Sequence, residues 1–219
     1  MKILLCPDSY KGSLSAIQVT EAMGTGIRRV FQDAEIVRLP IADGGEGTVE
    51  ALVMATEGEF RETEVCDPIG EPRLARLGIL GEGRTAVMEM AAASGLTWVP
   101  QEKRDPRQAT TFGTGEMIRA ALDERLRHFI IGIGGSATND GGVGMLRALG
   151  GRFLDREGQE LPEGGGSLID LDRIDLNGLD PRLAECRILI ACDVDNPLCG
   201  PRGASAVCGP QKGGTPEVA

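Results

Sequence analysis

The stretch Phe129-Ile130-Ile131-Gly132-Ile133-Gly134-Gly135-Ser136-Ala137-Thr138-Asn139-Asp140-Gly141-Gly142-Val143-Gly144 decides the fold of this chain. It opens with an apolar strand signal over 129–131, and a helical stretch over 145–149 follows it. A glycine-rich loop between a strand and a helix lets backbone N–H groups converge on an anion at the positive end of the helix dipole. The stretch therefore predicts an α/β protein that handles phosphate.

The composition points to a globular protein that does not bind nucleic acid. The chain has 219 residues, which is enough for one large domain or two small ones. Its net charge is -10 and its aromatic content is 3%, whereas nucleic acid requires a basic face and, for single strands, aromatic platforms. A small anionic ligand remains compatible with this charge, because a few local cations can bind it.

The apolar segments and the cysteines indicate a cytoplasmic protein. No apolar run is long enough to span a membrane, and the apolar stretch at 3–5 is too short for a signal peptide. The six cysteines include no CxxC pair and have no histidine partner for zinc, so we expect reduced thiols. Cys6 and Cys192 lie in apolar strand segments and are expected to be small core residues.

Strand and helix signals alternate through the first part of the chain. A buried strand is expected at 3–6, and a capping box from Ser15 to Gln18 begins a helix. A second strand at 35–39 and a second helix at 49–55 follow. This order predicts a parallel sheet covered on both faces.

The pattern changes from Phe60 onwards, where strand signals follow one another with turn residues between them. Such a switch suggests a second domain, so we divide the chain into a first α/β domain over 1–62 and a second over 63–219. The second domain is expected to contain mixed strands. Its expected elements are strands over 62–66, 74–80 and 85–90, a helix over 115–126, the strand at 129–131, and a last buried strand over 187–191.

Four polar clusters follow predicted strands, and ligands of open α/β sheets bind beyond the carboxyl ends of strands. The clusters lie at 8–13, 43–48, 132–142 and 193–196. Any one of them could be only a turn. Four together, two of them rich in glycine and three carrying acids, are difficult to explain as connections alone.

The glycine run differs from a P-loop because it contains no GK[ST] sequence. It matches G-x-G-x-x-A through Gly132, Gly134 and Ala137, and Asp155 falls about where a ribose-binding acid would. An NAD(P)-dependent oxidoreductase is therefore an alternative. Against it, the loop continues past Ala137 and carries the carboxylate of Asp140, which suits a metal-bound phosphate better than a bare one.

Lysines and acids supply the candidate catalytic groups. Lys11 and Lys212 lie in glycine-flanked loops, where a compact positive charge suits a phosphate or a carboxylate. Asp193 and Asp195 follow a predicted strand and could bind Mg²⁺ or accept a proton from a substrate hydroxyl, although a hydrogen-bonded turn explains them equally well. His128 is the single histidine and abuts a strand, so a histidine-driven triad is excluded.

Four motifs occurring in order make the chain resemble the bacterial glycerate kinase family that lacks a P-loop. They are PDSYKGSL at 7–14, ADGGEGT at 42–48, GGSATNDGG at 134–142 and GPQKG at 209–213. The resemblance implies transfer of the ATP γ-phosphoryl group to D-glycerate with Mg²⁺, in glyoxylate metabolism. The implied product is 2-phosphoglycerate, with the 3-hydroxyl left open.

The resemblance also implies a fold of two α/β domains. The first is Rossmann-like and is completed by a returning C-terminal segment, and the second is inserted into it. Family chains are markedly longer than this one, which stops soon after the motif at 209–213. We therefore expect a chain truncated at its C-terminus, with an incomplete first domain and a sheet edge exposed there.

Loop chemistry and the resemblance together assign candidate site residues. A homodimer is compatible with these assignments, and a non-catalytic nucleotide- or anion-binding fragment is a further alternative. The expected catalytic residues are Asp193, Lys11, Lys212 and Asp43; the ATP-binding residues are Gly134, Gly135, Ser136, Asn139, Gly141 and Gly142; the glycerate-binding residues are Asp8, Ser9, Gly45 and Glu46; and the metal ligands are Asp193 and Asp140.

Overall fold

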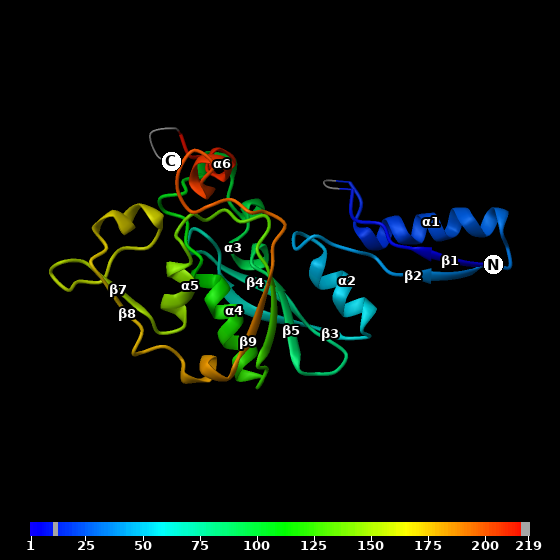
Figure 1. The fold of residues 1–219 in the computed structure, drawn as a ribbon, viewed down its shortest axis with the longest axis horizontal. Coiled ribbons are helices and arrows are strands. Elements are labelled where there is room, and N and C mark those ends of the chain that lie inside the picture. Colours follow the sequence, from blue (N-terminus) through cyan, green and yellow to red (C-terminus); the bar gives the residue numbers. More distant parts are fainter. Residues whose placement is uncertain (11–12, 216–219) are drawn as a thin grey trace.

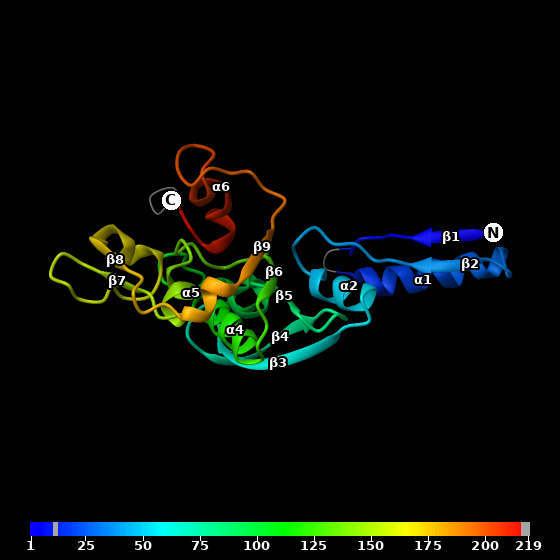
Figure 2. The same ribbon diagram turned by 60° about the horizontal axis from the view of Figure 1, so that its bottom comes forward.

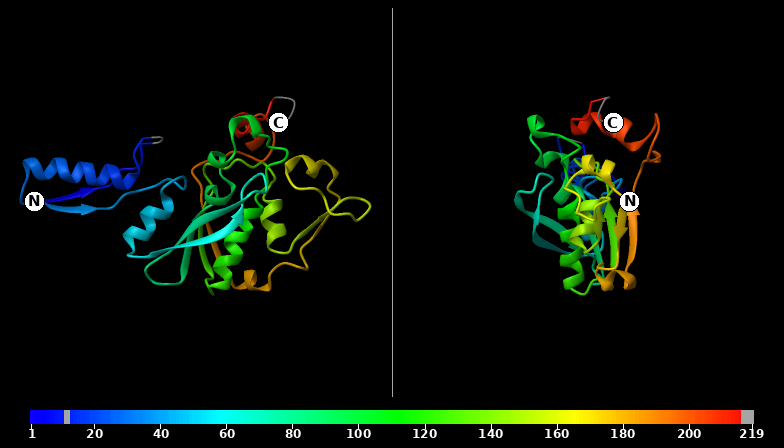
Figure 3. Two further views of the ribbon diagram at one scale, coloured as in Figure 1. Left: turned by 180° about the vertical axis from the view of Figure 1, so that it is seen from behind. Right: turned by 90° about the vertical axis from the view of Figure 1, so that its left-hand side faces the viewer.

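The computed structural model describes residues 1–10 and 13–215. Its main body surrounds a five-stranded sheet, and the N-terminal elements project from one side of it (Figure 1). A hairpin near residues 152–175 lies at the opposite end of the long axis (Figures 1 and 3). The α/β class predicted from the sequence is confirmed.

The N-terminal elements form a small parallel unit. Strand β1 (Lys2–Leu5) pairs with β2 (Glu35–Arg38), and helix α1 (Ala16–Val30) connects them. The predicted capping box is confirmed, because Gln18 N donates to Ser15 Oγ at 3.2 Å and Ser15 N donates to Gln18 Oε1 at 2.9 Å. In the described residues this sheet has two strands only.

The main sheet has the order β3-β4-β5-β6-β9 and is mixed, as predicted. Its first two pairs are antiparallel, whereas β5, β6 and β9 run parallel to one another. This arrangement brings the carboxyl ends of three strands to one edge. The strands are β3 (Glu59–Cys66), β4 (Pro72–Ile79), β5 (Thr85–Glu89), β6 (His128–Gly132) and β9 (Arg187–Ala191).

The larger hydrophobic core lies between one face of this sheet and helix α4 (Phe112–Asp123). Leu77, Met88, Met117 and Phe129 are almost completely buried there. Helix α4 begins and ends three residues earlier than the helix predicted over 115–126. Helix α5 (Val143–Ala148) packs against α4 and follows the glycine run, as expected.

Helix α2 (Thr48–Ala55) packs on the other face of the same sheet, so Figure 2 shows it beside the main body. Val49 and Val53 contact Val87 in a second core cluster. A side chain at Gly78 would lie 2.2 Å from a methyl group of Val53, so the helix approaches the strand closely. The sequence assigned this helix to the domain at 1–62, yet its packing partners lie beyond residue 62.

The remaining elements are short. Strands β7 (Arg152–Leu154) and β8 (Arg173–Asp175) form an antiparallel hairpin, and helices α3 (Ala91–Ser94) and α6 (Ala204–Cys208) flank the glycine run. No helix in residues 1–10 and 13–215 is long and apolar enough to cross a membrane. Short 3₁₀ helices cover Leu96–Trp98, Gln101–Lys103, Gly165–Asp170, Pro181–Glu185 and Pro210–Lys212.

Two predictions of buried strands are wrong. In β1 only Leu5 is buried, and the apolar side chains of β9 are 43–55% exposed. The reason is that β9 is the edge strand of its sheet and β1 belongs to a two-stranded sheet, so apolar sequence alone does not place them in a core. The residues expected to be buried but found exposed are Ile188, Leu189, Ile190, Cys6 and Cys192.

Candidate functional site

The candidate site lies at the carboxyl edge of the parallel strands. Glu89, Gly132 and Ala191 are register partners at the ends of β5, β6 and β9. The predicted clusters at 43–48 and 132–142 both lie at this edge. Two of the four loops that carry predicted site residues therefore meet at one edge of the sheet.

The two glycine-rich loops touch through their backbones. Gly134 N donates to Gly44 O at 3.4 Å. A Cβ at Gly132 would lie 2.3 Å from Gly44 O, and a Cβ at Gly44 would lie 2.7 Å from Ala191 O. Gly44 also has φ +92°, a conformation that favours glycine. Side chains are excluded at these positions because the loops pack directly against each other.

The glycine run has two backbone amides without a described hydrogen-bond acceptor. Gly135 O accepts from Leu96 N at 2.9 Å, and Ala137 N donates to Ser94 O at 2.9 Å, so the loop is held on both sides. Within the described part of the chain, the amides of Gly135 and Ser136 donate no hydrogen bond. Gly135 is exposed and Ser136 is half-buried, and successive amides without a protein acceptor can bind an anion. These two predicted ATP-binding residues are therefore well placed to bind an anion.

The carboxylate of Asp140 accepts hydrogen bonds from backbone amides at the start of α5, where the sequence analysis expected an anionic ligand. Its carboxylate is 2% exposed and accepts from Thr111 N and Thr111 Oγ1, both at 2.8 Å. It also accepts from Gly142 N and Gly144 N, both at 3.1 Å, at the start of α5. A dinucleotide-binding fold places a pyrophosphate at such a helix terminus. The contacts of Asp140 thus disfavour that alternative and favour a structural role over metal ligation.

The glycines that follow Asp140 shape the turn into α5. Gly141 and Gly142 have φ +61° and +80°. Neither residue belongs to the cavity described below. Their predicted contact with ATP stays a prediction.

The segment that contains α6 and Lys212 forms hydrogen bonds with the glycine run. Lys212 Nζ donates to Ser136 Oγ at 2.8 Å and to Thr138 O at 2.6 Å. Asn139 Nδ2 donates to Ser205 Oγ at 3.0 Å. Lys212 is only 7% exposed, and this burial lowers its pKa. The structure thus brings Lys212 to the predicted ATP-binding loop, although 76 residues separate it from Ser136.

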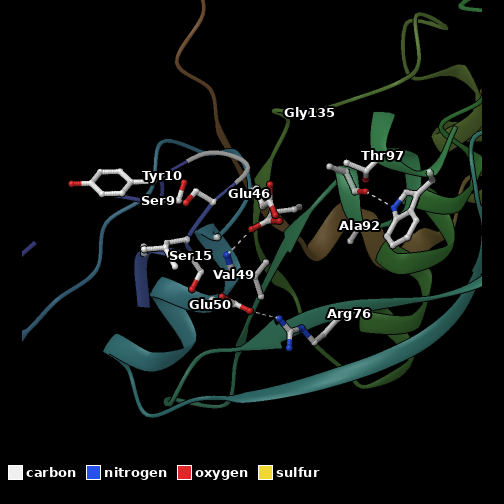
Figure 4. A pocket seen from close by; sticks show the side chains of 17 residues that line it. Ser9, Tyr10, Ser15, Glu46, Val49, Glu50, Arg76, Ala92, Thr97 and Gly135 are labelled. Atoms are coloured by element: carbon white, nitrogen blue, oxygen red, sulfur yellow. Dashed lines mark hydrogen bonds and ion pairs between the residues drawn. The ribbon is translucent and has the colours of Figure 1, made fainter. Parts of the chain in front are cut away.

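A cavity of about 530 Å³ opens between the N-terminal unit and the main sheet (Figure 4). Ser9 and Tyr10 lie on one side and Thr97 on the other, with Glu46 between them. Gly135 of the glycine run also lines it. Three of the four sequence motifs therefore converge on one cavity.

Two aspartates shape the loops that reach this cavity. Asp8 Oδ1 accepts from Ser9 N at 2.6 Å, and Asp43 Oδ1 accepts from Gly45 N at 3.0 Å. The predicted glycerate-binding residues Ser9 and Glu46 are among the lining residues. Asp8 and Gly45 are adjacent to lining residues and Asp43 lies three residues before Glu46, so their predicted roles stay predictions.

Arg76 is a lining residue that the sequence analysis missed. Its Nη2 lies 2.6 Å from Glu50 Oε1, and its guanidinium lies 4.3 Å from the centre of the Phe60 ring. Among the described lining residues it is the one cationic side chain. No local motif marks it, because it lies in the middle of β4.

Glu89 is a second lining residue that the sequence analysis missed. It ends β5, and its Oε1 accepts from Val49 N at 3.0 Å, at the start of α2. Burial raises the pKa of this carboxyl above its ordinary value despite that hydrogen bond. The one signal in the sequence is an acid that closes an apolar strand.

The remaining predicted residues lie away from the cavity or outside the described structure. Asp193 is exposed beyond β9 and is not a lining residue. Lys11 lies outside the described residues. Residues 1–10 and 13–215 contain no group of three histidine, cysteine or acidic side chains that could hold a metal ion.

Comparison with known proteins yields a consistent set of relatives. Residues 3–219 match the model of the glycerate kinase family. The chain is 58% identical over 218 residues to a glycerate kinase of Bacillus subtilis, covering all of this chain and 57% of that protein. It is 57% identical over 213 residues to a glycerate 2-kinase of Escherichia coli, covering 97% of this chain and 56% of that protein.

A solved structure is similar over the whole chain. It is a crystal structure of a protein from Salmonella typhimurium LT2 that is described as glycerate kinase 2, with a TM-score of 0.91 and 56% sequence identity. The match covers 100% of this chain and 59% of that one. The chain thus spans a little over half the length of the relatives it matches.

Proposed function

The chain belongs to the glycerate kinase family, and from this premise we propose that the protein transfers the γ-phosphoryl group of ATP to a hydroxyl of D-glycerate. We favour the 2-hydroxyl, because one relative is named a glycerate 2-kinase. The proposal applies to the full-length protein, since relatives extend well beyond the length of this chain. We expect it to act in the cytoplasm, in the phosphorylation of small organic acids.

The single observation that carries the proposal is the convergence of three motifs on one cavity. Ser9, Glu46 and Gly135 come from three separate motifs and line the same space. Phosphoryl transfer requires an acceptor and a phosphate to be held side by side, and the protein contributes mainly position and charge. Loops from three parts of the chain that line one cavity suit that task.

The ATP phosphates are assigned to the glycine run. The amides of Gly135 and Ser136 would donate to phosphate oxygens, as backbone amides do in other anion sites. Lys212 would keep Ser136 in place through the 2.8 Å hydrogen bond to its hydroxyl. Mg²⁺ is expected to enter with the phosphates, because it binds substrate phosphates together with only one or two carboxylates.

Glycerate is assigned to the opposite part of the cavity. Its hydroxyls suit Ser9 and Glu46, which can donate and accept hydrogen bonds. Its carboxylate suits Arg76, since a guanidinium forms strong charge-assisted hydrogen bonds with carboxylates. Arg76 uses one nitrogen for Glu50 and retains other donors.

We also propose that the rest of the full-length protein completes the first domain. The two-stranded sheet of β1 and β2 is small for an independent unit. A returning segment would add strands beside it. The boundary would fall near residue 40, since α2 packs on the main sheet.

The test is glycerate-dependent release of ADP from MgATP. The 219-residue chain is assayed beside a version extended to the length of the relatives, and ³¹P NMR identifies the phosphorylated hydroxyl. We expect turnover by the extended protein. Nucleotide binding by a folded extended protein without turnover would instead support a non-catalytic binding protein, and saturable NADH binding without ATP binding would support an oxidoreductase.

A further inference from the structure

We propose that Glu89 is the catalytic base that accepts the proton of the glycerate hydroxyl. This inference rests on the proposed kinase function and assigns to Glu89 the role that the sequence gave to Asp193. It is argued from the position of Glu89, from the contacts of the competing carboxylates and from the balance of the reaction.

Glu89 lies beside the start of the glycine run. In the parallel pairing of β5 and β6 its register partner is Gly132. The next residue, Met90, donates from its backbone N to Gly132 O at 2.9 Å. Glu89 and Gly135 both line the cavity. A carboxylate at this position lies at the same sheet edge as the glycine run, where the transferred phosphoryl group is proposed to bind.

The other lining carboxylates are less suited to the task. Glu50 forms an ion pair with Arg76 at 2.6 Å, so its carboxylate is already engaged by a cation. Glu46 is exposed to solvent. Glu89 is half-buried and has no ion pair with any described residue. It is therefore the lining carboxylate whose surroundings favour proton uptake.

Two candidate carboxylates outside the cavity, Asp140 and Asp193, are less suited to the task. Asp140 is enclosed by four donors from Thr111, Gly142 and Gly144. Asp193 is exposed and does not line the cavity. A base must come within hydrogen-bond distance of the proton that it removes, so geometry is the first criterion.

The hydrogen bond from Val49 N orients Glu89 without neutralising it. It joins Oε1 to the start of α2 at 3.0 Å and so fixes the carboxylate relative to the Asp43–Thr48 loop. Burial raises the pKa of the Glu89 carboxyl more than the backbone amides of residues 47–49 lower it, and the neighbouring charge of Glu46 adds to the rise. A base whose pKa is raised in this way holds a transferred proton more firmly.

The step balances with the two substrates alone. The glycerate hydroxyl oxygen forms a bond to the γ-phosphorus as the bond from that phosphorus to the bridging oxygen breaks. The bridging electron pair leaves with ADP. The hydroxyl proton passes to the Glu89 carboxylate and then to solvent, which regenerates the base.

The test compares Glu89→Gln and Asp193→Asn in the full-length protein. We expect Glu89→Gln to lower kcat by about 100-fold or more, the usual contribution of a general base. The KM for glycerate and the affinity for MgATP should change less than threefold. The acidic limb of the kcat–pH profile should disappear. Glu62→Gln, an exposed carboxylate on β3, is the matched control and should match the wild type.

Each outcome supports or overturns the assignment of Glu89 as the base. If the wild type is active and Glu89→Gln keeps its kcat within threefold of the wild-type value, the inference is overturned but the kinase function stands. The same conclusion follows if the acidic limb is lost in Asp193→Asn instead of in Glu89→Gln. A folded but inactive wild type overturns the kinase function itself. If Glu89→Gln does not fold, Glu89→Asp decides, because a base predicts an acidic limb displaced to lower pH and an unmoved limb contradicts it.

Discussion

Arg76 is the residue on which recognition of the organic acid should depend. Its guanidinium is held by Glu50 at 2.6 Å and stacks on Phe60, so it reaches the cavity with little freedom. A preorganised cation loses less entropy when it binds a carboxylate. If Arg76 binds the carboxylate as proposed, these contacts hold its guanidinium in position for that ligand.

Substitution Arg76→Met should weaken glycerate binding selectively. Hydrogen bonds to charged groups contribute about 1.5–3 kcal/mol, so we expect the KM for D-glycerate to rise roughly 10–100-fold. The KM for ATP should stay within twofold, since ATP is assigned to the glycine run. Steady-state kinetics measure both constants. Arg61→Met removes an arginine outside the cavity and is the control; equal effects on both substrates in Arg76→Met would contradict the assignment.

The raised pKa of Glu89 has a consequence for stability. Because the folded protein holds this proton more firmly than the unfolded chain, Glu89 stabilises the fold below the ordinary pKa of 4.5, and that stabilisation is lost as pH rises through the folded pKa. In Glu89→Gln this loss cannot occur. The free energy of unfolding of the variant should therefore rise relative to that of the wild type between pH 4 and pH 7. Urea titrations at several pH values measure the difference, and a constant difference would contradict the shift.

At the scale of elements, the contact between the two glycine loops controls the geometry of the site. The Asp43–Thr48 loop rests on the carboxyl ends of β6 and β9 through Gly44, Gly132 and Ala191. Backbone that approaches this closely leaves no room for a methyl group. The position of Glu46 in the cavity thus depends on a glycine about 90 residues away in the sequence.

Substitution Gly132→Ala should displace the Asp43–Thr48 loop. The added Cβ would lie 2.3 Å from Gly44 O, and neither atom belongs to a flexible side chain. We expect a loss of about 1–3 kcal/mol in the free energy of unfolding, as in overpacked cores. The KM for glycerate should rise as well.

The matched control is Gly26→Ala, in α1. No atom lies within 4 Å of the Cβ that this change would add, and alanine favours the helix by roughly 1 kcal/mol. Chemical denaturation and steady-state kinetics compare the two variants. Equal stability of Gly132→Ala and the wild type would show that the loops can separate without cost.

Local signals in the sequence predicted most elements, and long-range contacts account for what it missed. The capping box at Ser15 and the glycine run depend on neighbouring residues, so the sequence alone reveals them. Arg76 and Glu89 reach the cavity because β4 and β5 are placed beside α2, which no local pattern specifies. The burial of β9 was predicted wrongly because it depends on what covers an edge strand.

At the scale of the whole molecule, the exposed apolar strands are the feature expected to promote association between chains. Ile188, Leu189 and Ile190 in β9 are 43–55% exposed, and Leu4 in β1 is 57% exposed. Exposed apolar edge strands promote association between chains. Relatives have further sequence that this chain does not contain.

We expect the 219-residue chain to bind the dye ANS and to self-associate. The version extended to the length of the relatives should bind less dye and have a higher melting temperature, because additional chain buries apolar surface. Light scattering coupled to size-exclusion chromatography measures association. A monomeric short chain with no dye binding would show that these strands need no cover.

The backbone contact between Gly44 and Gly132 also means that two sides of the cavity are not independent of each other. The glycine run and the loop over 43–48 pack directly together, so a displacement of one changes its contact with the other. Glu46 and Gly135 line the cavity from these two loops, whereas Ser9 and Tyr10 come from the N-terminal unit. A substitution in either glycine-rich loop should therefore alter the lining that both loops contribute.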